Sequence, residues 1–347
     1  ILITVDPEIP VPPKHYGGIE RIVDMLARGL AARGHDVQLL CNPDSDAAVH
    51  LVPYAGSRSD SLRDTMLNAY QLWKHVHEEP VDIIHSFGRL AYLLPVLRLP
   101  IPKIQSYQRH VTARSVQWGN RLAMGTLTFT ACSEYCAGTG RHAGGRWTAI
   151  SNGVPMSKYA FSPSVPENAP LVFLGRVERI KGAHTAIKVA LQTGKRLIIA
   201  GNRASEGPEA DYFESEIAPH CCNDTQITYI GPVTDVQKTD LLGSAAALLF
   251  PIEWEEPFGI VMAEALACGT PVVAFNRGAV PEVVAHGTTG FLCSSAEDMV
   301  AAVSKIPKIS RLCCRLSCEE RFSADVIVNR YEELYRMRRA TVREGRL

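Results

Sequence analysis

The sequence predicts an α/β protein built from two doubly wound domains, each with a parallel sheet. Three observations predict this fold class. The chain has 347 residues, enough for two domains of ordinary size. Short apolar segments alternate with helical patterns along nearly all of it. A proline-rich segment at 162–170 interrupts the alternation once. Because parallel strands need a crossover between them, this alternation predicts parallel sheets.

The first domain is expected to cover residues 1–161. It begins with an apolar strand at 1–5 and a loop rich in proline. Apolar side chains at 19, 22, 23, 26 and 30 then follow helical spacing, and Gly34 suits the end of that helix. The same alternation predicts further strands at 37–41, 81–85, 103–106, 126–131 and 147–150, and helices at 61–77, 90–97 and 134–139.

The second domain is expected to cover 171–323, after a linker at 162–170. Its predicted strands are 171–174, 196–200, 227–230, 247–251, 271–275 and 290–293, and its predicted helices are 183–192, 209–217, 235–244, 258–268, 280–286 and 296–305. A last helix is expected within 324–347. In such domains ligands bind outside the carboxyl ends of the strands, so two facing domains predict a ligand cleft between them.

Composition excludes several classes of protein. Hydrophobic residues make up 46% and charged residues 21%, which is typical of a globular protein and not of a disordered chain. Lys plus Arg and Asp plus Glu number 36 each, so no overall field favours nucleic acid. None of the ten cysteines forms a C-x-x-C pair. Zinc-ribbon and thioredoxin-like functions are therefore disfavoured, and we expect free thiols in a reducing cytosol.

The charges are unevenly placed within the first domain. Residues 83–133 contain no Asp or Glu. The basic residues of this stretch are Arg89, Arg98, Lys103, Arg109, Arg114 and Arg121. One interpretation is a solvated surface with a chance excess of one sign. The other is a wall that faces an anionic ligand or a membrane surface.

One segment of the second domain predicts an anion site. Pro257 suits the first position of a helix that directly follows a strand, which leaves the amides of Phe258, Gly259 and Ile260 free for an anion. Glu264 lies on this helix among apolar residues. It either faces solvent on a surface stripe or binds a polar ligand such as a ribose diol. Glu256 lies eight residues earlier, at most ~12 Å away along a helix.

Two cations occupy a second informative segment. Arg176 follows the strand at 171–174, and Lys181 precedes the next helix. Both therefore belong to the carboxyl edge of the sheet. An Arg fork and a Lys point charge can neutralise a diphosphate leaving group without a metal. Each residue taken alone is better explained as part of an ordinary exposed loop.

Seven short motifs follow one another along the chain. They are P-x-x-x-x-G-G-I-E at 12–20, R-G-H-D-V at 33–37, D-I-I-H at 82–85, S-N-G-V at 151–154, G-R-V-x-x-x-K-G at 175–182, E-x7-E at 256–264 and G-T-T-G-F-L at 287–292. With these motifs the chain resembles the retaining glycosyltransferases of family 4. The resemblance covers nearly the whole chain. It implies the GT-B fold, in which two Rossmann-like domains face a central cleft.

The resemblance implies a role for each donor-side residue. Arg176 and Lys181 would bind the diphosphate, Glu264 the ribose and Glu256 the donor sugar. The other implied donor contacts are the amides of Phe258, Gly259, Ile260 and Val261, the backbone at Gly17 and Gly18, and the base-binding strand end at Gly231 and Val233. Asn202 and Arg203, which follow the strand at 196–200, line the same edge of the sheet. The C-terminal helix of the family crosses back to the first domain, which implies the same for 324–347.

The acceptor side departs from the family pattern. Where the family usually has a histidine near the reacting carbon, this sequence has Gln108, and His110 follows two residues later. Either His110 serves after a local shift or Gln108 replaces it. We take His110 as the catalytic candidate, together with Arg176, Lys181 and Glu256. His85 and Arg109 are further acceptor-side candidates, although His85 is equally well explained as a packed histidine.

The resemblance thus implies a retaining transferase that uses a UDP- or GDP-sugar as co-substrate, with no metal or other cofactor. Its acceptor would be a glycan, a lipid-linked sugar or a small natural product. It would act in the cytoplasm, either free or in peripheral contact with the inner face of the membrane. Two alternatives stay open: a nucleotide-sugar-binding protein without turnover, and a nucleotide-sugar epimerase of the same fold. A dinucleotide-dependent oxidoreductase is disfavoured because no G-x-G-x-x-G follows the first strand.

Overall fold

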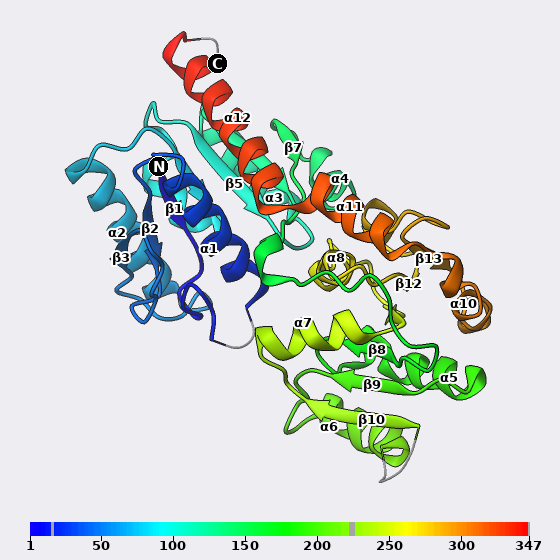
Figure 1. The fold of residues 1–347 in the computed structure, drawn as a ribbon. Helices are drawn as coiled ribbons and strands as arrows, with labels where there is room; N and C mark the ends of the chain where they lie inside the picture. The colour runs from blue at the N-terminus through cyan, green and yellow to red at the C-terminus, as the bar shows by residue number, and fades with distance from the viewer. Residues whose placement is uncertain (15–16, 222–225, 346–347) are drawn as a thin grey trace. The chain divides into compact units, whose positions relative to one another are not determined.

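The computed structural model describes residues 1–14, 17–221 and 226–345, which form two α/β units (Figure 1). The first unit consists of Ile1–Gly153 together with Ala324–Leu347, and the second is Val154–Ser323. Each unit has one sheet, and its neighbouring strands pair in parallel. The predicted fold class, two Rossmann-like domains of the GT-B type, is confirmed.

The first unit has a seven-stranded sheet among its described residues, in the order β3-β2-β1-β4-β5-β6-β7. The strands are β1 (Leu2–Thr4), β2 (Gln38–Cys41), β3 (His50–Pro53), β4 (Ile84–Ser86), β5 (Lys103–Tyr107), β6 (Leu127–Ala131) and β7 (Trp147–Ala149). The sequence does not predict β3. This edge strand is only partly buried, so it lacks the apolar run by which the inner strands are recognised.

Helices cover both faces of this sheet. They are α1 (Gly18–Ala31), α2 (Leu62–Glu78), the 3₁₀ helix η1 (Leu90–Val96), α3 (Ala113–Leu122), α4 (Glu134–Arg141) and α12 (Ala324–Arg343). Right-handed crossovers leave β1 and β3 in opposite directions across the sheet, which places α1 on one face and α2, η1 and α3 on the other. The sequence predicts an α-helix at 90–97, but Pro95 lies inside it and the turn is 3₁₀.

The last helix, α12, packs on α1. A Cβ at Gly29 would lie 2.5 Å from a methyl carbon of Val328, so glycine lets the two helices approach closely. Arg33 extends the contact by donating to the side chains of Asn329, at 2.6 Å, and Glu332, at 3.2 Å. The C-terminal helix therefore belongs to the first unit, although it follows the second along the chain.

The second unit has a six-stranded sheet in the described chain, in the order β10-β9-β8-β11-β12-β13. Its strands are β8 (Leu171–Leu174), β9 (Leu197–Ala200), β10 (Ile227–Gly231), β11 (Ala247–Phe250), β12 (Val272–Phe275) and β13 (Gly290–Cys293). Its α-helices are α5 (Ala183–Thr193), α6 (Pro208–Tyr212), α7 (Asp235–Ser244), α8 (Ile260–Ala267), α9 (Val280–Val283), α10 (Ala296–Val303) and α11 (Arg311–Phe322). The remaining turns are η2 (Met156–Lys158), η3 (Arg179–Lys181), a π turn η4 (Phe213–Ile217), η5 (Ala218–His220) and η6 (Ile306–Lys308).

Residues 154–170 pack within the second unit. The sequence predicts that the first domain extends to residue 161 and that 162–170 is a linker, whereas the observed division falls at Val154. Two arginines of α11 hold the segment: Arg315 donates to the Tyr159 carbonyl at 2.7 Å, and Arg311 donates to the Ser162 carbonyl at 2.7 Å. The prolines of this segment indicate irregular backbone in the sequence, but they do not indicate which domain the segment packs against.

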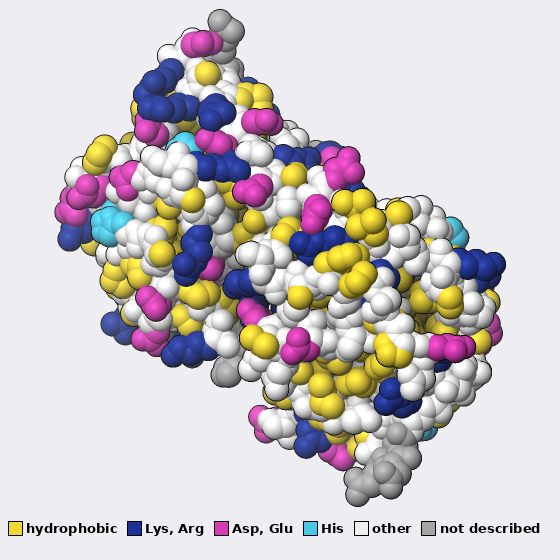
Figure 2. Space-filling model, viewed as in Figure 1, with side chains coloured by type: hydrophobic (Ala, Val, Ile, Leu, Met, Phe, Trp, Pro, Cys, Tyr) yellow, Lys and Arg dark blue, Asp and Glu magenta, His cyan; other side chains and the backbone are white. Residues whose placement is uncertain are grey.

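Two further observations concern the chain as a whole. The nine described cysteines are all free thiols, and Cys222 lies outside the described residues. In the part of the chain that the structure describes, no helix is both long and apolar enough to cross a bilayer. Basic and acidic side chains are interspersed over the face shown in Figure 2, in agreement with equal numbers of the two signs.

The Arg311 guanidinium gives a stability prediction. It is buried and donates to the carbonyls of Ser162, Gly243 and Ala245 and to the Thr270 hydroxyl, at 2.7–2.9 Å. Arg311→Ala should lower the free energy of unfolding by about 3 kcal/mol or more, because these acceptors lose a charged donor. The measurement is the urea midpoint by circular dichroism. The exposed Lys305→Ala is the control, expected to change it by less than about 0.5 kcal/mol; equal effects would contradict the prediction.

Candidate functional site

The predicted donor residues follow neighbouring strands of the second sheet. Strands β8 and β11 pair in parallel, so the loops after Leu174 and Phe250 leave the same edge. Gly182, at the end of the first loop, has φ 78°, and a Cβ there would lie 2.0 Å from the Pro251 carbonyl oxygen. Only glycine permits this approach. The two loops are therefore packed together, and they carry Lys181 and Glu256.

Lys181 and Glu256 form a buried ion pair. The Lys181 Nζ lies 2.9 Å from Glu256 Oε2, and the indole Nε1 of Trp254 donates to the same oxygen at 2.9 Å. Lys181 Nζ also lies 4.7 Å from the centroid of the Trp254 ring. Glu256 is 8% exposed, and its other oxygen, Oε1, accepts no hydrogen bond from the residues described. The carboxylate is thus fixed with one oxygen still available.

The loop after β12 supports Glu256 from behind. The Ala279 amide donates to the Glu256 carbonyl at 2.8 Å, and the Gly278 amide donates to Glu255 Oε2 at 2.6 Å. Gly278 has φ 57°, and a Cβ there would lie 2.4 Å from the Glu256 carbonyl oxygen. The sequence analysis does not include Gly278 in the site. An isolated glycine after a strand is a common turn signal, and its function here depends on a loop that is remote in sequence.

Glu264 is buried, so the surface-stripe interpretation is wrong. It is 4% exposed, and its Oε1 accepts a hydrogen bond from the Tyr159 hydroxyl at 2.7 Å. Lys238 Nζ lies 2.5 Å from the same oxygen. The second oxygen, Oε2, accepts no hydrogen bond among the described residues. A buried carboxylate with one neutralised oxygen and one unused oxygen is suited to accept hydrogen bonds from a polar ligand.

Lys238 and Tyr159 are site residues that the sequence analysis misses. Lys238 lies on α7, whose start is fixed by a capping box between Thr234 and Gln237. Its Nζ lies 5.6 Å from the centroid of the Tyr159 ring. A lysine on a polar helix carries no sequence signal of burial, and Tyr159 lies outside every motif. Their involvement follows from the packing of α7 and η2 beside α8.

The start of α8 matches the predicted anion site in position. Gly259 precedes the helix with φ 75°, and no side chain caps it, in contrast to Thr234 at α7. A Cβ at Gly259 would lie 2.7 Å from Met262 Cε and 3.3 Å from Glu256 Cγ. Phe258 is buried against Phe322, while Ile260 and Val261 are half-buried. The helix begins two residues later than the predicted 258, because residues 257–259 form the turn that positions Glu256.

Arg176 and the base-side residues lie at neighbouring strand ends. Arg176 follows β8, is 41% exposed, and pairs with Glu178. Gly231 ends β10 with φ 76°, and its carbonyl accepts from the Gly201 amide at 2.8 Å. Val233 is half-buried just beyond it.

Arg203 and Asn202 make contacts within the second unit. Arg203 donates to Glu214 at 2.9 Å and lies over the Phe213 ring, and the Asn202 carbonyl accepts a hydrogen bond from the Val177 amide.

In the first unit, Gly17 and Gly18 occupy the start of α1. A Cβ at Gly17 would lie 2.6 Å from Pro13 Cβ and 2.9 Å from Glu20 Oε2, whereas a Cβ at Gly18 would meet nothing within 4 Å. Close approach therefore requires glycine at 17. Glu20 is a buried carboxylate of the same turn; it ends the motif at 12–20, but the sequence analysis assigns it no role. Burial raises the pKa of Glu20, and the charge of Asp6 adds to this effect.

The acceptor-side candidates lie in different environments. His85 is fully buried; its Nδ1 lies 2.6 Å from the Tyr335 hydroxyl and its Nε2 2.6 Å from the Ser106 hydroxyl. This is the packed histidine of the two interpretations. Gln108 Oε1 accepts from the Asn152 amide at 2.8 Å, which ties it to the S-N-G-V motif. Arg109 and His110 are exposed; Arg109 lies 3.7 Å from Asp6, and His110 packs edge-on against Tyr135.

Comparison with known proteins identifies the family. A family model of the glycosyl transferases group 1 matches residues 159–318, and one of glycosyltransferase family 4 matches residues 16–158. Together the two models account for most of the chain, and they match the two units in the order of the resemblance. The chain is a family 4-like glycosyltransferase.

Curated relatives of this glycosyltransferase carry the same class of activity in their names. Glycogen synthase of Mycobacterium tuberculosis is 26% identical over 352 residues, covering 85% of this chain and 83% of that protein. Alpha-maltose-1-phosphate synthase of the same species is 36% identical over 132 residues, covering 37% of this chain and 34% of its own length.

Solved structures show the same fold as this glycosyltransferase. AviGT4, a glycosyltransferase involved in avilamycin A biosynthesis, superposes with a TM-score of 0.74 at 24% identity, covering 98% of both chains. Anabaena Alr3699/HepE, solved in complex with UDP and glucose, has a TM-score of 0.74 at 20% identity, covering 96% of this chain and 98% of its own.

One large cavity of the second unit lies outside the site. A cavity of about 1140 Å³ is lined by Leu171, Ala246 and Pro271, at the amino ends of β8, β11 and β12. It is therefore at the opposite edge of the sheet from Glu256 and Glu264.

Among the described residues, no group of three or more His, Cys, Asp or Glu side chains is placed to hold a metal ion.

The Lys238–Glu264 pair generates the second prediction. Lys238→Met should lower the free energy of unfolding by about 3–5 kcal/mol, because it leaves the Glu264 charge buried and uncompensated. The double variant Lys238→Met with Glu264→Gln should recover most of this loss. The matched control is Lys188→Met, whose partner Glu297 is 69% exposed, expected to cost at most about 1 kcal/mol. Additive effects of the two site substitutions in urea unfolding would show that the pair is not coupled.

The third prediction concerns His85. Burial lowers its pKa to about 3 from the ordinary 6.5. Between these values the unfolded chain binds a proton that the folded chain excludes, so this residue makes stability fall as pH falls, by about 1.4 kcal/mol per pH unit. His85→Gln should remove that contribution from the slope of unfolding free energy between pH 6.5 and 4. The exposed His77→Gln is the control, and equal slopes in wild type and His85→Gln would contradict the prediction.

Proposed function

We propose that this glycosyltransferase moves a sugar from a nucleoside-diphosphate sugar to its acceptor with retention of anomeric configuration and without a metal. The arrangement of two buried carboxylates, each fixed by a lysine, at the carboxyl edge of the second sheet carries this proposal. Each carboxylate keeps one oxygen that no described residue uses. Two such oxygens, with cations beside them, suit a ligand that has hydroxyl groups at both ends and negative charge between them.

We assign the ribose to Glu264. Its Oε1 is held by Lys238 and Tyr159, so Oε2 can accept from the hydroxyls of a ribose. The base would lie at the end of β10, by Gly231 and Val233. UDP or GDP is the proposed carrier. The UDP and UDP-glucose complexes of Alr3699/HepE, a protein of the same fold, support UDP.

We assign the diphosphate to Arg176, Lys181 and the first amides of α8. Lys181 Nζ has three N–H donors, of which Glu256 accepts one in the described structure. Arg176 presents its guanidinium at the same edge of the sheet. Together they would offset the charge that develops on the diphosphate as the glycosidic bond breaks. This division of charge supports a reaction that needs no metal ion.

The donor sugar would lie on Glu256 Oε1, with the reacting carbon between the diphosphate and the acceptor. In the proposed step the bond from the anomeric carbon to the diphosphate oxygen breaks, and the acceptor oxygen bonds to that carbon on the same face. The acceptor proton passes to a diphosphate oxygen. We assign His110 to the acceptor side, with Gln108 as the alternative. The acceptor class is a glycan, a lipid-linked sugar or a small molecule, and we place the reaction in the cytoplasm, with the inner membrane face as a further location.

The donor is tested by thermal shift with UDP, GDP, ADP and dTDP and their sugar conjugates, in EDTA. One series should raise the melting temperature, because a ligand at 100 times its Kd adds about 2.7 kcal/mol. Arg176→Ala should lower kcat by roughly 10- to 100-fold with a smaller change in donor Kd, since a charge-assisted bond contributes about 1.5–3 kcal/mol. The exposed Lys308→Ala is the control.

Several outcomes would contradict this proposal. Stabilisation that requires a divalent metal would reject metal independence, and an inverted product anomer in NMR would reject retention. Wild-type turnover in Arg176→Ala would reject the site assignment. Isomerised donor sugar without acceptor would indicate an epimerase. Donor binding with neither transfer nor hydrolysis would indicate a binding protein.

A further inference from the structure

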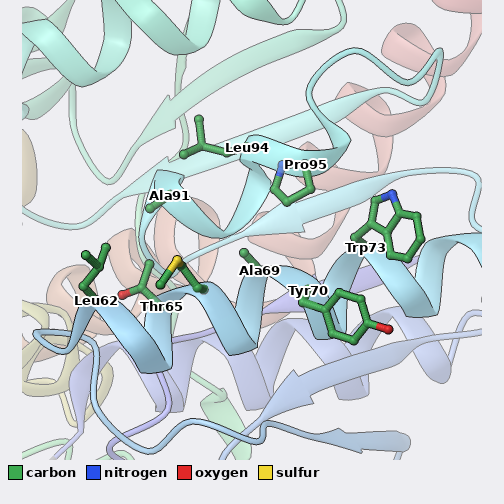
Figure 3. A pocket seen from close by; sticks show the side chains of 9 residues that line it. Leu62, Thr65, Ala69, Tyr70, Trp73, Ala91, Leu94 and Pro95 are labelled. Carbon is green, nitrogen blue, oxygen red and sulfur yellow. The ribbon is translucent and has the colours of Figure 1, made fainter.

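The first unit exposes an apolar groove that the donor chemistry does not use. It has a volume of about 530 Å³ and lies between α2 and η1 (Figure 3). Figure 3 shows Leu62, Tyr70 and Trp73 on α2 and Leu94 and Pro95 on η1 along its walls. Leu62 is 73% exposed and Leu94 is 54% exposed. Apolar side chains gathered on one exposed face, instead of scattered singly, mark an interaction surface.

Helix α2 has a buried inner side and an exposed apolar outer side. Its inner side packs on the sheet through Thr65, Asn68, Leu72 and His75, which are buried. Its outer side carries Leu62, Met66, Tyr70 and Trp73, at the spacing i, i+4, i+8 and i+11. At about 100° per residue, Leu62, Met66 and Trp73 lie within about 40° of one another around the helix. The core accounts for the inner side only, so the outer stripe requires another explanation.

Basic residues border this stripe. On α2, Arg63 and Lys74 lie beside Tyr70, while Asp64 and Glu78 lie farther round the helix. The Asp64 carboxylate accepts from the amides of Ser57 and Arg58, and Glu78 lies 3.8 Å from Lys74.

Helix α3 extends the same face. It packs against η1, where a Cβ at Gly119 would lie 2.8 Å from Leu90 Cδ2. Its exposed side carries Arg114, Trp118 and Arg121 at the spacing i, i+4 and i+7, and Trp118 is 61% exposed. Neither arginine forms an ion pair with a described residue. Residues 83–133, which include η1 and α3, contain no acidic side chain that could pair with them.

We propose that the face formed by α2, η1 and α3 binds the surface of an anionic phospholipid bilayer. The acyl chains of such a bilayer would contact the apolar groove, and its negative charge would attract the arginines. Trp73, Tyr70 and Trp118 would lie at the level of the lipid headgroups, where amphipathic aromatic side chains are enriched. A second copy of the chain fits this face less well. A two-fold interface would bring the acid-free segment of one copy against that of the other, and the arginines would repel. The proposal is independent of the donor site, which lies in the second unit.

The test is co-sedimentation with vesicles of phosphatidylcholine alone and with 30 mol% phosphatidylglycerol. The full chain should partition at least about tenfold more strongly onto the anionic vesicles, and this preference should fall between 0.1 and 0.5 M salt. Arg114→Gln with Arg121→Gln should weaken partitioning by about 25-fold, since each basic residue near the surface contributes about fivefold. Met66→Gln with Leu94→Gln should weaken it by at least about tenfold, through lost apolar contact.

Matched controls carry the same changes elsewhere. Lys305→Gln with Lys308→Gln removes two exposed charges from the second unit, and Leu312→Gln with Leu316→Gln replaces two side chains that are 52% and 51% exposed. Both control variants should partition like wild type. The replaced residues of the face are exposed, so folding should survive. The melting shift produced by the stabilising nucleoside diphosphate, measured on the same samples, should be that of wild type.

Four outcomes would overturn the proposal. They are absence of binding to anionic vesicles, equal binding to neutral vesicles, losses in the control variants as large as those in the face variants, and self-association abolished by the face variants. The last would make a second copy the occupant. Because the nucleotide shift is measured separately, failure of the membrane surface is distinguishable from failure of the donor site.

Discussion

The burial of two carboxylates around α8 is the constraint on which the candidate site depends. Glu256 precedes the helix and Glu264 lies within it, and neither could stay charged there without a cation. Lys181 arrives from the turn after β8 and Lys238 from α7. The two ion pairs therefore fix four elements relative to one another. Each lysine contacts only one carboxylate oxygen, so the other oxygen of Glu256 and of Glu264 accepts no hydrogen bond from the described residues.

Glycine makes this arrangement sterically accessible. At Gly182 and Gly278 a Cβ would overlap backbone atoms of the neighbouring loop, so the strand-end loops approach one another at backbone distance. The ends of β8, β11 and β12 are thereby joined into one rigid edge. Side chains on such an edge lose little further entropy when a ligand binds, and this preorganisation favours binding and electrostatic catalysis.

The first unit repeats the doubly wound architecture but distributes its apolar surface differently. On one face of its sheet, α12 packs on α1, with Gly29 beneath Val328. On the other, α2 covers the sheet and still presents an apolar outer stripe. His85 illustrates the interior: both ring nitrogens bond to hydroxyls of the same unit, so the ring is a neutral packing element.

The sequence by itself determined most of the strands and helices, the two-domain class and the family, because burial periodicity, glycine and proline positions and short motifs are local properties. It also placed Arg176, Lys181, Glu256 and Glu264 at strand ends and a helix start. Tertiary structure alone decided that Glu264 is buried, that Lys238 and Tyr159 hold it, and that residues 154–170 pack with the second unit. It also added β3, α3 and α11, whose few buried residues do not form a recognisable apolar period in the sequence. The reason is physical: the charge that compensates a buried group can come from any distance along the chain, and only packing selects it.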